Sequence, residues 1–171
     1  MQSQLNYEIL QARWERSWEM FPDGFNLRMR RSLSWIGRAE EEMSADDPDA
    51  AFIFYWIAFN AVYVEGKREF SSERFTFSDY FDKILELDNS MAIYNLIWQE
   101  FSDPIRNLLD NRYVFEPFWR HHNGMPGYED WENSFRRSRQ RVHTFLAEQN
   151  TKAILSTLFD RLYVLRNQLL H

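Results

Sequence analysis

Apolar side chains recur every three or four residues along most of the chain, which is the spacing of one face of an α-helix. The first such run comprises Tyr7, Leu10, Trp14, Trp18 and Phe21. It predicts a helix that ends at residues 22–24, because proline, aspartate and glycine follow one another there. A second helix is predicted over residues 25–43, where apolar positions again share one face.

Residues 51–63 are apolar on all sides apart from Asn60, which predicts a central helix that several neighbours touch. The acidic segment 46–49 precedes this run and contains Pro48, a combination typical of a helix start. A buried strand is the competing interpretation, but the run is too long for a strand and contains three alanines. One face of the predicted helix should lie in or near the core and consists of Phe52, Trp56, Phe59 and Tyr63.

The rest of the chain also has helical spacing, with one irregular stretch. Helices are predicted over residues 76–87, from a cap at Asn89 to 101, from 103 toward 114, over 129–148 and from 151 to the end. Residues 116–128 read as irregular, with turns at 123–124 and 126–127. No repeat or linker divides the chain, so we expect an all-α helical bundle that forms one domain over residues 1–171.

Composition narrows the fold and the chemistry. Five glycines and five prolines among 171 residues argue against a turn-rich all-β fold. The absence of cysteine excludes disulfides, thiolate metal sites and cysteine nucleophiles, and fits a reducing cytoplasm. A net charge of −6 does not indicate nucleic-acid binding, which usually shows as a basic surface. We expect neither a signal peptide nor a membrane span, and therefore a cytoplasmic protein.

The last six residues hold the residues best suited to chemistry. A helix turns 100° per residue, so Asn167 and His171 share one face with Tyr163, and Arg166 lies beside that line. Arginine can bind phosphate through its forked guanidinium, and histidine can transfer protons near neutral pH. The alternative is a solvated helix end, because basic residues are favoured at helix C-termini in any case.

The pattern of Arg166, Asn167, three further residues and His171 resembles the signature of the HEPN superfamily. The aromatic segment 56–63 is similar to the helix that packs beside the motif helix in the Apea-like, abortive-infection-type branch. The resemblance implies a HEPN-like helical homodimer that cuts RNA without a metal or other cofactor. It also implies a toxin or antiviral defence effector that a cognate antitoxin or regulatory protein could control.

The resemblance implies a role for each motif residue. Arg166 would hold phosphate, His171 would transfer protons, and Asn167 would orient them or bond phosphate. One chain offers one motif histidine, so a two-fold dimer would bring two histidines and two arginines into one cleft. The chain stops at His171, whereas relatives resembling this branch continue with small residues and another helix. This departure indicates either a C-terminal truncation or an atypical end.

Four further residues are candidates for substrate contacts, and all of them except Tyr163 have two interpretations. Asn60 is either a satisfied polar group of the core or a residue that orients Arg166 or Asn167, and Tyr163 belongs to the substrate-binding cluster. Arg136 and Arg137 begin a basic cluster that forms either a solvated helix face or a phosphate-tracking surface.

No metal site is expected in this chain. His121 and His122 are adjacent, and adjacent histidines do not easily reach one ion. The rival to the ribonuclease hypothesis is a non-catalytic helical module that dimerises or binds a partner protein or a nucleotide. The acidic net charge supports this rival.

Overall fold

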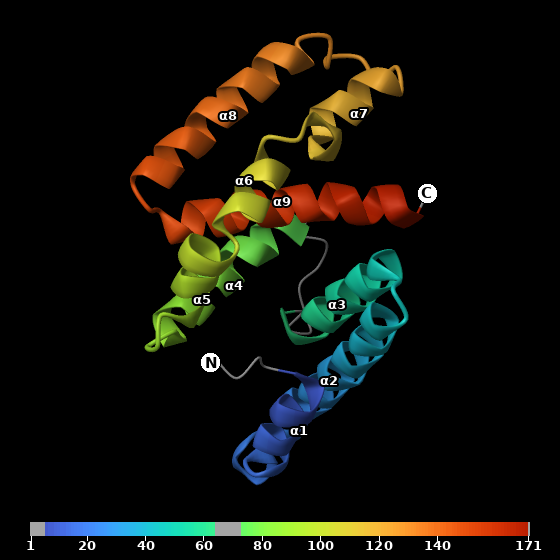
Figure 1. Ribbon diagram of the computed structural model, residues 1–171, viewed down its shortest axis with the longest axis vertical. Coiled ribbons are helices and arrows are strands. Elements are labelled where there is room, and N and C mark those ends of the chain that lie inside the picture. Colours follow the sequence, from blue (N-terminus) through green and yellow to red (C-terminus); the bar gives the residue numbers. More distant parts are fainter. Residues whose placement is uncertain (1–5, 64–72, 171) are drawn as a thin grey trace. The chain divides into compact units, whose positions relative to one another are not determined.

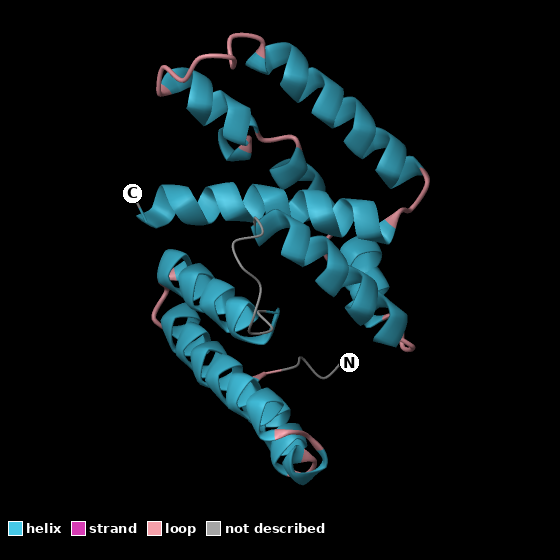
Figure 2. Ribbon diagram, turned by 180° about the vertical axis from the view of Figure 1, so that it is seen from behind, coloured by secondary structure: helices cyan, strands magenta, loops and turns pink. Residues whose placement is uncertain are grey.

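The computed structural model describes residues 6–63 and 73–170. Every regular element in these two ranges is a helix, and neither range contains a strand, which confirms the all-α class (Figures 1 and 2). The chain divides into two compact units, Met1–Ser71 and Ser72–His171. The single domain over residues 1–171 stays a prediction. In the described part of the chain, no helix combines the length and hydropathy that a membrane span requires.

In its described residues, 6–63, the first unit has three α-helices and a 3₁₀ turn: α1 (Tyr7–Glu15), η1 (Trp18–Met20), α2 (Asp23–Ser44) and α3 (Pro48–Tyr63). The prediction that the first helix continues to Phe21 was wrong, because α1 ends at Glu15. Asn26 of α2 holds the turn that follows. Its side-chain amide donates to the carbonyls of Trp18 and Phe21, at 2.8 and 3.0 Å, and its oxygen accepts from the Trp14 indole at 3.1 Å.

Helices α2 and α3 form an antiparallel hairpin (Figure 1). Asp47 caps α3 by accepting from the Ala50 N–H at 3.0 Å, and Pro48 is the first helical residue, so the predicted start is confirmed. The predicted core face is confirmed in part, because Trp56 and Tyr63 are buried whereas Phe52 and Phe59 are partly buried.

The second unit contains α4 (Glu73–Leu87), α5 (Ala92–Asn95), a π-helical turn η2 (Leu96–Glu100), α6 (Ser102–Leu109), a 3₁₀ turn η3 (Arg112–Val114), α7 (Glu116–His122), α8 (Trp131–Ala147) and α9 (Thr151–Leu170). Helix α9 is its centre and contacts α4, α6, α8 and η3. In both views the hairpin of α7 and α8 lies on one side of α9, and α4 lies on the other (Figures 1 and 2).

Two sequence predictions for this unit were wrong. Asn89 does not cap α5: the N-cap residue is Met91, and the Asp88 carboxylate accepts from the N–H groups of Ala92 and Ile93, both at 2.8 Å. The stretch 116–128 was predicted to be irregular, but it begins with α7. The two turns predicted after it are present, with Gly124 and Gly127 at φ values of 73° and 89°, which glycine adopts without strain.

Two groups of buried side chains hold α9 in place. Phe81 of α4 is 1% exposed, and its ring meets Phe159 of α9 edge to face at 4.8 Å. A second cluster joins α7 to α8 and comprises Phe115, Phe118, Trp131 and the partly buried Phe135. Arg161 of α9 is also buried in this region, and its guanidinium lies 4.6 Å from the Phe115 ring centre. The helix that carries Arg166 and Asn167 is therefore fixed from two sides.

Candidate functional site

Two residues of the cluster predicted on α9, Arg166 and Tyr163, are in contact. The guanidinium carbon of Arg166 lies 4.7 Å from the ring centre of Tyr163, within the range of a cation–π contact. Arg166, Asn167 and Tyr163 are all partly exposed, so solvent reaches this cluster. His171 lies outside the described residues.

Tyr163 and Asn167 line a cleft of about 420 Å³ between α9 and α7, which we call the motif cleft. This volume falls within the range of roughly 300–1,000 Å³ that is usual for small-ligand sites. The other residues that line it are Glu116, Trp119, Arg120, Asn123, Val164 and Gln168. Helix α7 and Asn123, which follows it, therefore supply half of the lining, and the sequence analysis assigned no site residue to this segment.

Arg120 brings a guanidinium to the motif cleft, which Arg166 does not line. It donates to Glu116 Oε1 through Nη2 at 2.6 Å and through Nε at 3.0 Å, and its Nη1 donates to the Tyr128 hydroxyl at 2.6 Å. The hydrogen bond to Glu116 raises the pKa of Arg120 above its usual value. Three bonds thus fix the position of Arg120 in a cleft that Asn167 also lines, and Glu116 balances its charge. The i, i+4 spacing of Glu116 and Arg120 could have indicated this pair, had the segment been read as a helix.

The carbonyl oxygen of Tyr113 connects the two walls of the motif cleft. It accepts a hydrogen bond from the Trp119 indole of α7 at 2.6 Å. It also accepts one from the side-chain amide of Gln168 of α9. Since both donors line the cleft, this carbonyl in η3 fixes the position of α7 relative to α9.

The remaining predicted site residues lie elsewhere. Asn60 belongs to the first unit, so its predicted contact with Arg166 or Asn167 stays a prediction. Its side-chain oxygen is buried and has no hydrogen-bond partner among the described residues. In α8, Arg137 donates to Ser134 Oγ at 3.0 Å, whereas Arg136 lines a different cleft, between α8 and η3.

His121 and His122 do not form a ligand pair. Their rings are nearly perpendicular, and the ring of His122 stacks on Phe118 with centres 4.0 Å apart. The Nδ1 atom of His122 lies 2.8 Å from the Phe118 carbonyl oxygen. In the part of the chain that the structure describes, no three His, Cys, Asp or Glu side chains are grouped so that they could hold a metal ion.

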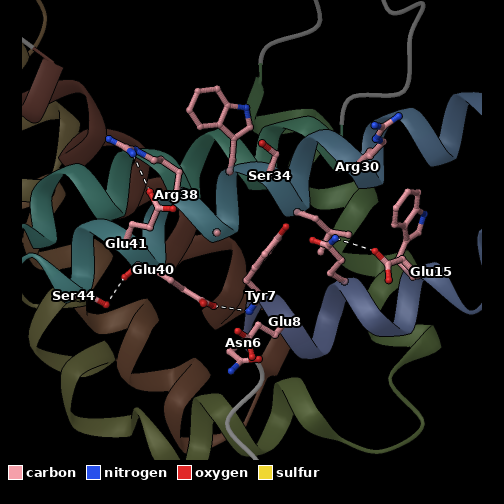
Figure 3. A pocket seen from close by; sticks show the side chains of 15 residues that line it. Asn6, Tyr7, Glu8, Glu15, Arg30, Ser34, Arg38, Glu40, Glu41 and Ser44 are labelled. Atoms are coloured by element: carbon pink, nitrogen blue, oxygen red, sulfur yellow. Dashed lines mark hydrogen bonds and ion pairs between the residues drawn. The ribbon is translucent and has the colours of Figure 1, made fainter.

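A larger groove of about 1270 Å³ lies between α1 and α2 in the first unit (Figure 3). Some of the groups that line it bond to one another: Glu40 accepts from the backbone N–H of Tyr7 at 2.7 Å, and Arg38 pairs with Glu41 at 2.8 Å. A Cβ atom at Gly37 would lie 3.2 Å from the Tyr7 ring. The groove therefore surrounds a close contact between two helices, and it contains none of the predicted site residues.

Comparisons of the chain with protein-family models, with curated proteins and with solved structures found no match. The motif cleft and its charges are therefore the basis for a functional proposal.

Proposed function

We propose that the chain is a metal-independent endoribonuclease of the HEPN type that acts as a homodimer. One observation carries the proposal: Arg166 lies over Tyr163, and Tyr163 lines the motif cleft together with Asn167 and the hydrogen-bonded Arg120. His171 follows Asn167 by one helical turn in the sequence. An arginine and an amide are groups that can bind an RNA phosphate and stabilise charge that develops on it.

The proposed reaction is an internal transfer at one phosphate of the RNA. The ribose 2′-oxygen attacks the adjacent phosphorus while its proton passes to one His171. The bond from phosphorus to the 5′-oxygen breaks, and the second His171, from the partner subunit, protonates that oxygen. The products are a 2′,3′-cyclic phosphate and a 5′-hydroxyl. Arg166 stabilises the negative charge that grows on the phosphate oxygens, and Asn167 orients the phosphate.

Under this proposal the chain serves in the cytoplasm as a toxin or antiviral defence effector. A free ribonuclease would damage the RNA of its own cell, so the proposal includes a cognate antitoxin or another regulatory protein. Two-fold assembly is a chemical requirement here, because each subunit supplies one motif histidine. Light scattering should therefore give a dimer at micromolar concentration, and a monomer would count against the composite site.

The test is cleavage of a single-stranded RNA in EDTA, with the products identified by mass spectrometry. We expect cleavage that leaves a cyclic phosphate, and no cleavage at a position whose ribose lacks the 2′-hydroxyl. His171→Ala and Arg166→Ala should each abolish cleavage. Matched controls are His143→Ala and Arg13→Ala, because both side chains are exposed and lie outside the motif cleft.

Two outcomes would overturn the proposal. One is full activity of either motif variant. The other is absence of cleavage by a chain that is folded and dimeric, as circular dichroism and light scattering would report. The second outcome would favour the non-catalytic module that dimerises or binds a partner protein or a nucleotide.

A further inference from the structure

A second cleft, of about 390 Å³, lies between η3 and the first half of α8, and we call it the arginine cleft. Its lining includes two arginines, Arg112 from η3 and Arg136 from α8, and one exposed aromatic side chain, Tyr113. The Arg112 guanidinium carbon lies 5.4 Å from the Tyr113 ring centre. The cleft thus combines two cations with an exposed aromatic ring.

The arginines of this cleft differ in their partners. Arg139, at its edge, donates to Asp110 at 2.8 Å and so neutralises a carboxylate that lines the cleft. Within residues 6–63 and 73–170, neither Arg112 nor Arg136 has a carboxylate at ion-pair distance, and both are exposed. Glu132 remains as an unneutralised acid in the lining. Two arginines are therefore available to an anion, which Glu132 would repel.

Tyr113 joins the arginine cleft to the motif cleft. Its side chain is 51% exposed and lines the arginine cleft. Its carbonyl oxygen accepts hydrogen bonds from Trp119 and Gln168, which line the motif cleft. The two clefts are consequently neighbours held by one residue. A ligand long enough to leave the motif cleft past Trp119 would meet Tyr113 and then the arginines.

We propose that the arginine cleft binds one nucleotide of the RNA strand. This nucleotide follows the cleaved phosphate, at the point where the strand leaves the motif cleft. Tyr113 stacks on the base, and Arg112 and Arg136 bind phosphate. Stacking on an aromatic side chain together with a positively charged groove is the usual way in which proteins hold single strands without reading their sequence. This inference rests on the proposed function, since it adds a strand-binding subsite to that cleft.

The first experiment measures binding of a fluorescent 2′-O-methyl RNA by anisotropy over a series of NaCl concentrations. This RNA lacks the attacking hydroxyl, so binding is measured whether or not the protein cleaves. The double variant Arg112→Gln, Arg136→Gln should bind more weakly. Each lost phosphate contact on a single strand should lower the slope of log K against log salt by about 0.7, and two contacts by about 1.4. Arg13→Gln removes one positive charge in the first unit, against two in the double variant, and should leave the slope unaltered.

The second experiment separates stacking from charge. Replacing Tyr113 by Leu should weaken binding roughly 5- to 150-fold, the range for loss of one stacked base. Tyr113→Phe keeps the ring and should bind as the unaltered protein does. Glu132→Gln removes the repelling acid and should tighten binding. In each variant the Tyr113 carbonyl remains, so the bonds to Trp119 and Gln168 are not removed.

Three results decide between this subsite and other assignments. A salt slope of the double variant equal to that of Arg13→Gln would overturn the inference. If a mononucleotide displaced the RNA at micromolar concentration, the ligand of the arginine cleft would be a free nucleotide and not an RNA strand. If the unaltered protein fails to cleave RNA but these variants still change binding, the proposed function fails while the binding subsite stands.

Discussion

The replacement Phe81→Ala tests the packing of α4 against α9, the helix that carries Arg166 and Asn167. The Phe81 side chain is 1% exposed, and its ring contacts those of Phe77 and Phe159. A buried aromatic side chain removes roughly 150 Å² or more from water, which at about 25 cal/mol per Å² corresponds to about 4 kcal/mol. This agrees with the range of about 3–5 kcal/mol for Phe→Ala replacements in cores. We therefore expect a loss of about 4 kcal/mol in the free energy of unfolding.

The edge-to-face contact of Phe81 with Phe159 adds a second quantity. In a double-mutant cycle with Phe81→Leu and Phe159→Leu, we expect a coupling of about 0.5–1.5 kcal/mol. The assay is urea unfolding followed by circular dichroism and by tryptophan fluorescence, and coincident curves justify a two-state treatment. The control is Phe101→Ala, whose side chain is 50% exposed, with a loss of about 0.5 kcal/mol or less. A loss below about 1 kcal/mol for Phe81→Ala would refute the packing of α4 on α9.

Two further stability predictions use the same assay. Asp88→Ala removes the acceptor of two N–H groups at the start of α5, and it should cost about 1–2 kcal/mol. Asn89→Ala, one residue away, should cost less than about 0.5 kcal/mol, and equal losses would refute the cap. Trp56→Ala removes a side chain that is 5% exposed, and it should cost about 3–5 kcal/mol. A loss under about 1 kcal/mol would mean that α3 is misplaced.

The sequence predicted those helix boundaries that neighbouring residues set. Asp47 and Pro48 mark the start of α3. The hydrogen bond that defines this start joins the Asp47 side chain to the N–H of Ala50, only three residues later. The end of α1 escaped prediction because Asn26, twelve residues after Trp14, holds the turn that follows. Helix α7 escaped prediction for a similar reason: it packs through Phe118 on Trp131, and a contact between separate elements leaves no periodic signal.

For the same reason, only part of the candidate site could be predicted from the sequence. The grouping of Tyr163, Arg166 and Asn167 follows from helical geometry, and the contact of Arg166 with Tyr163 agrees with it. The opposite wall of the motif cleft depends on how α7 folds against α9, so sequence spacing gave no reason to place Arg120 there. Tyr113 was missed as well, because its connecting atom is a backbone oxygen, which every residue type carries.

The use of a backbone atom at position 113 makes this position suitable for a spectroscopic label. Replacing the side chain leaves the carbonyl that receives Trp119 and Gln168 in place. The chain contains no cysteine, so Tyr113→Cys would introduce a single thiol. A fluorophore attached to that thiol would sit at the junction of the two clefts and would report the arrival of a ligand by a change in emission. The protein can thus be labelled through a thiol at one defined position without first replacing a native cysteine.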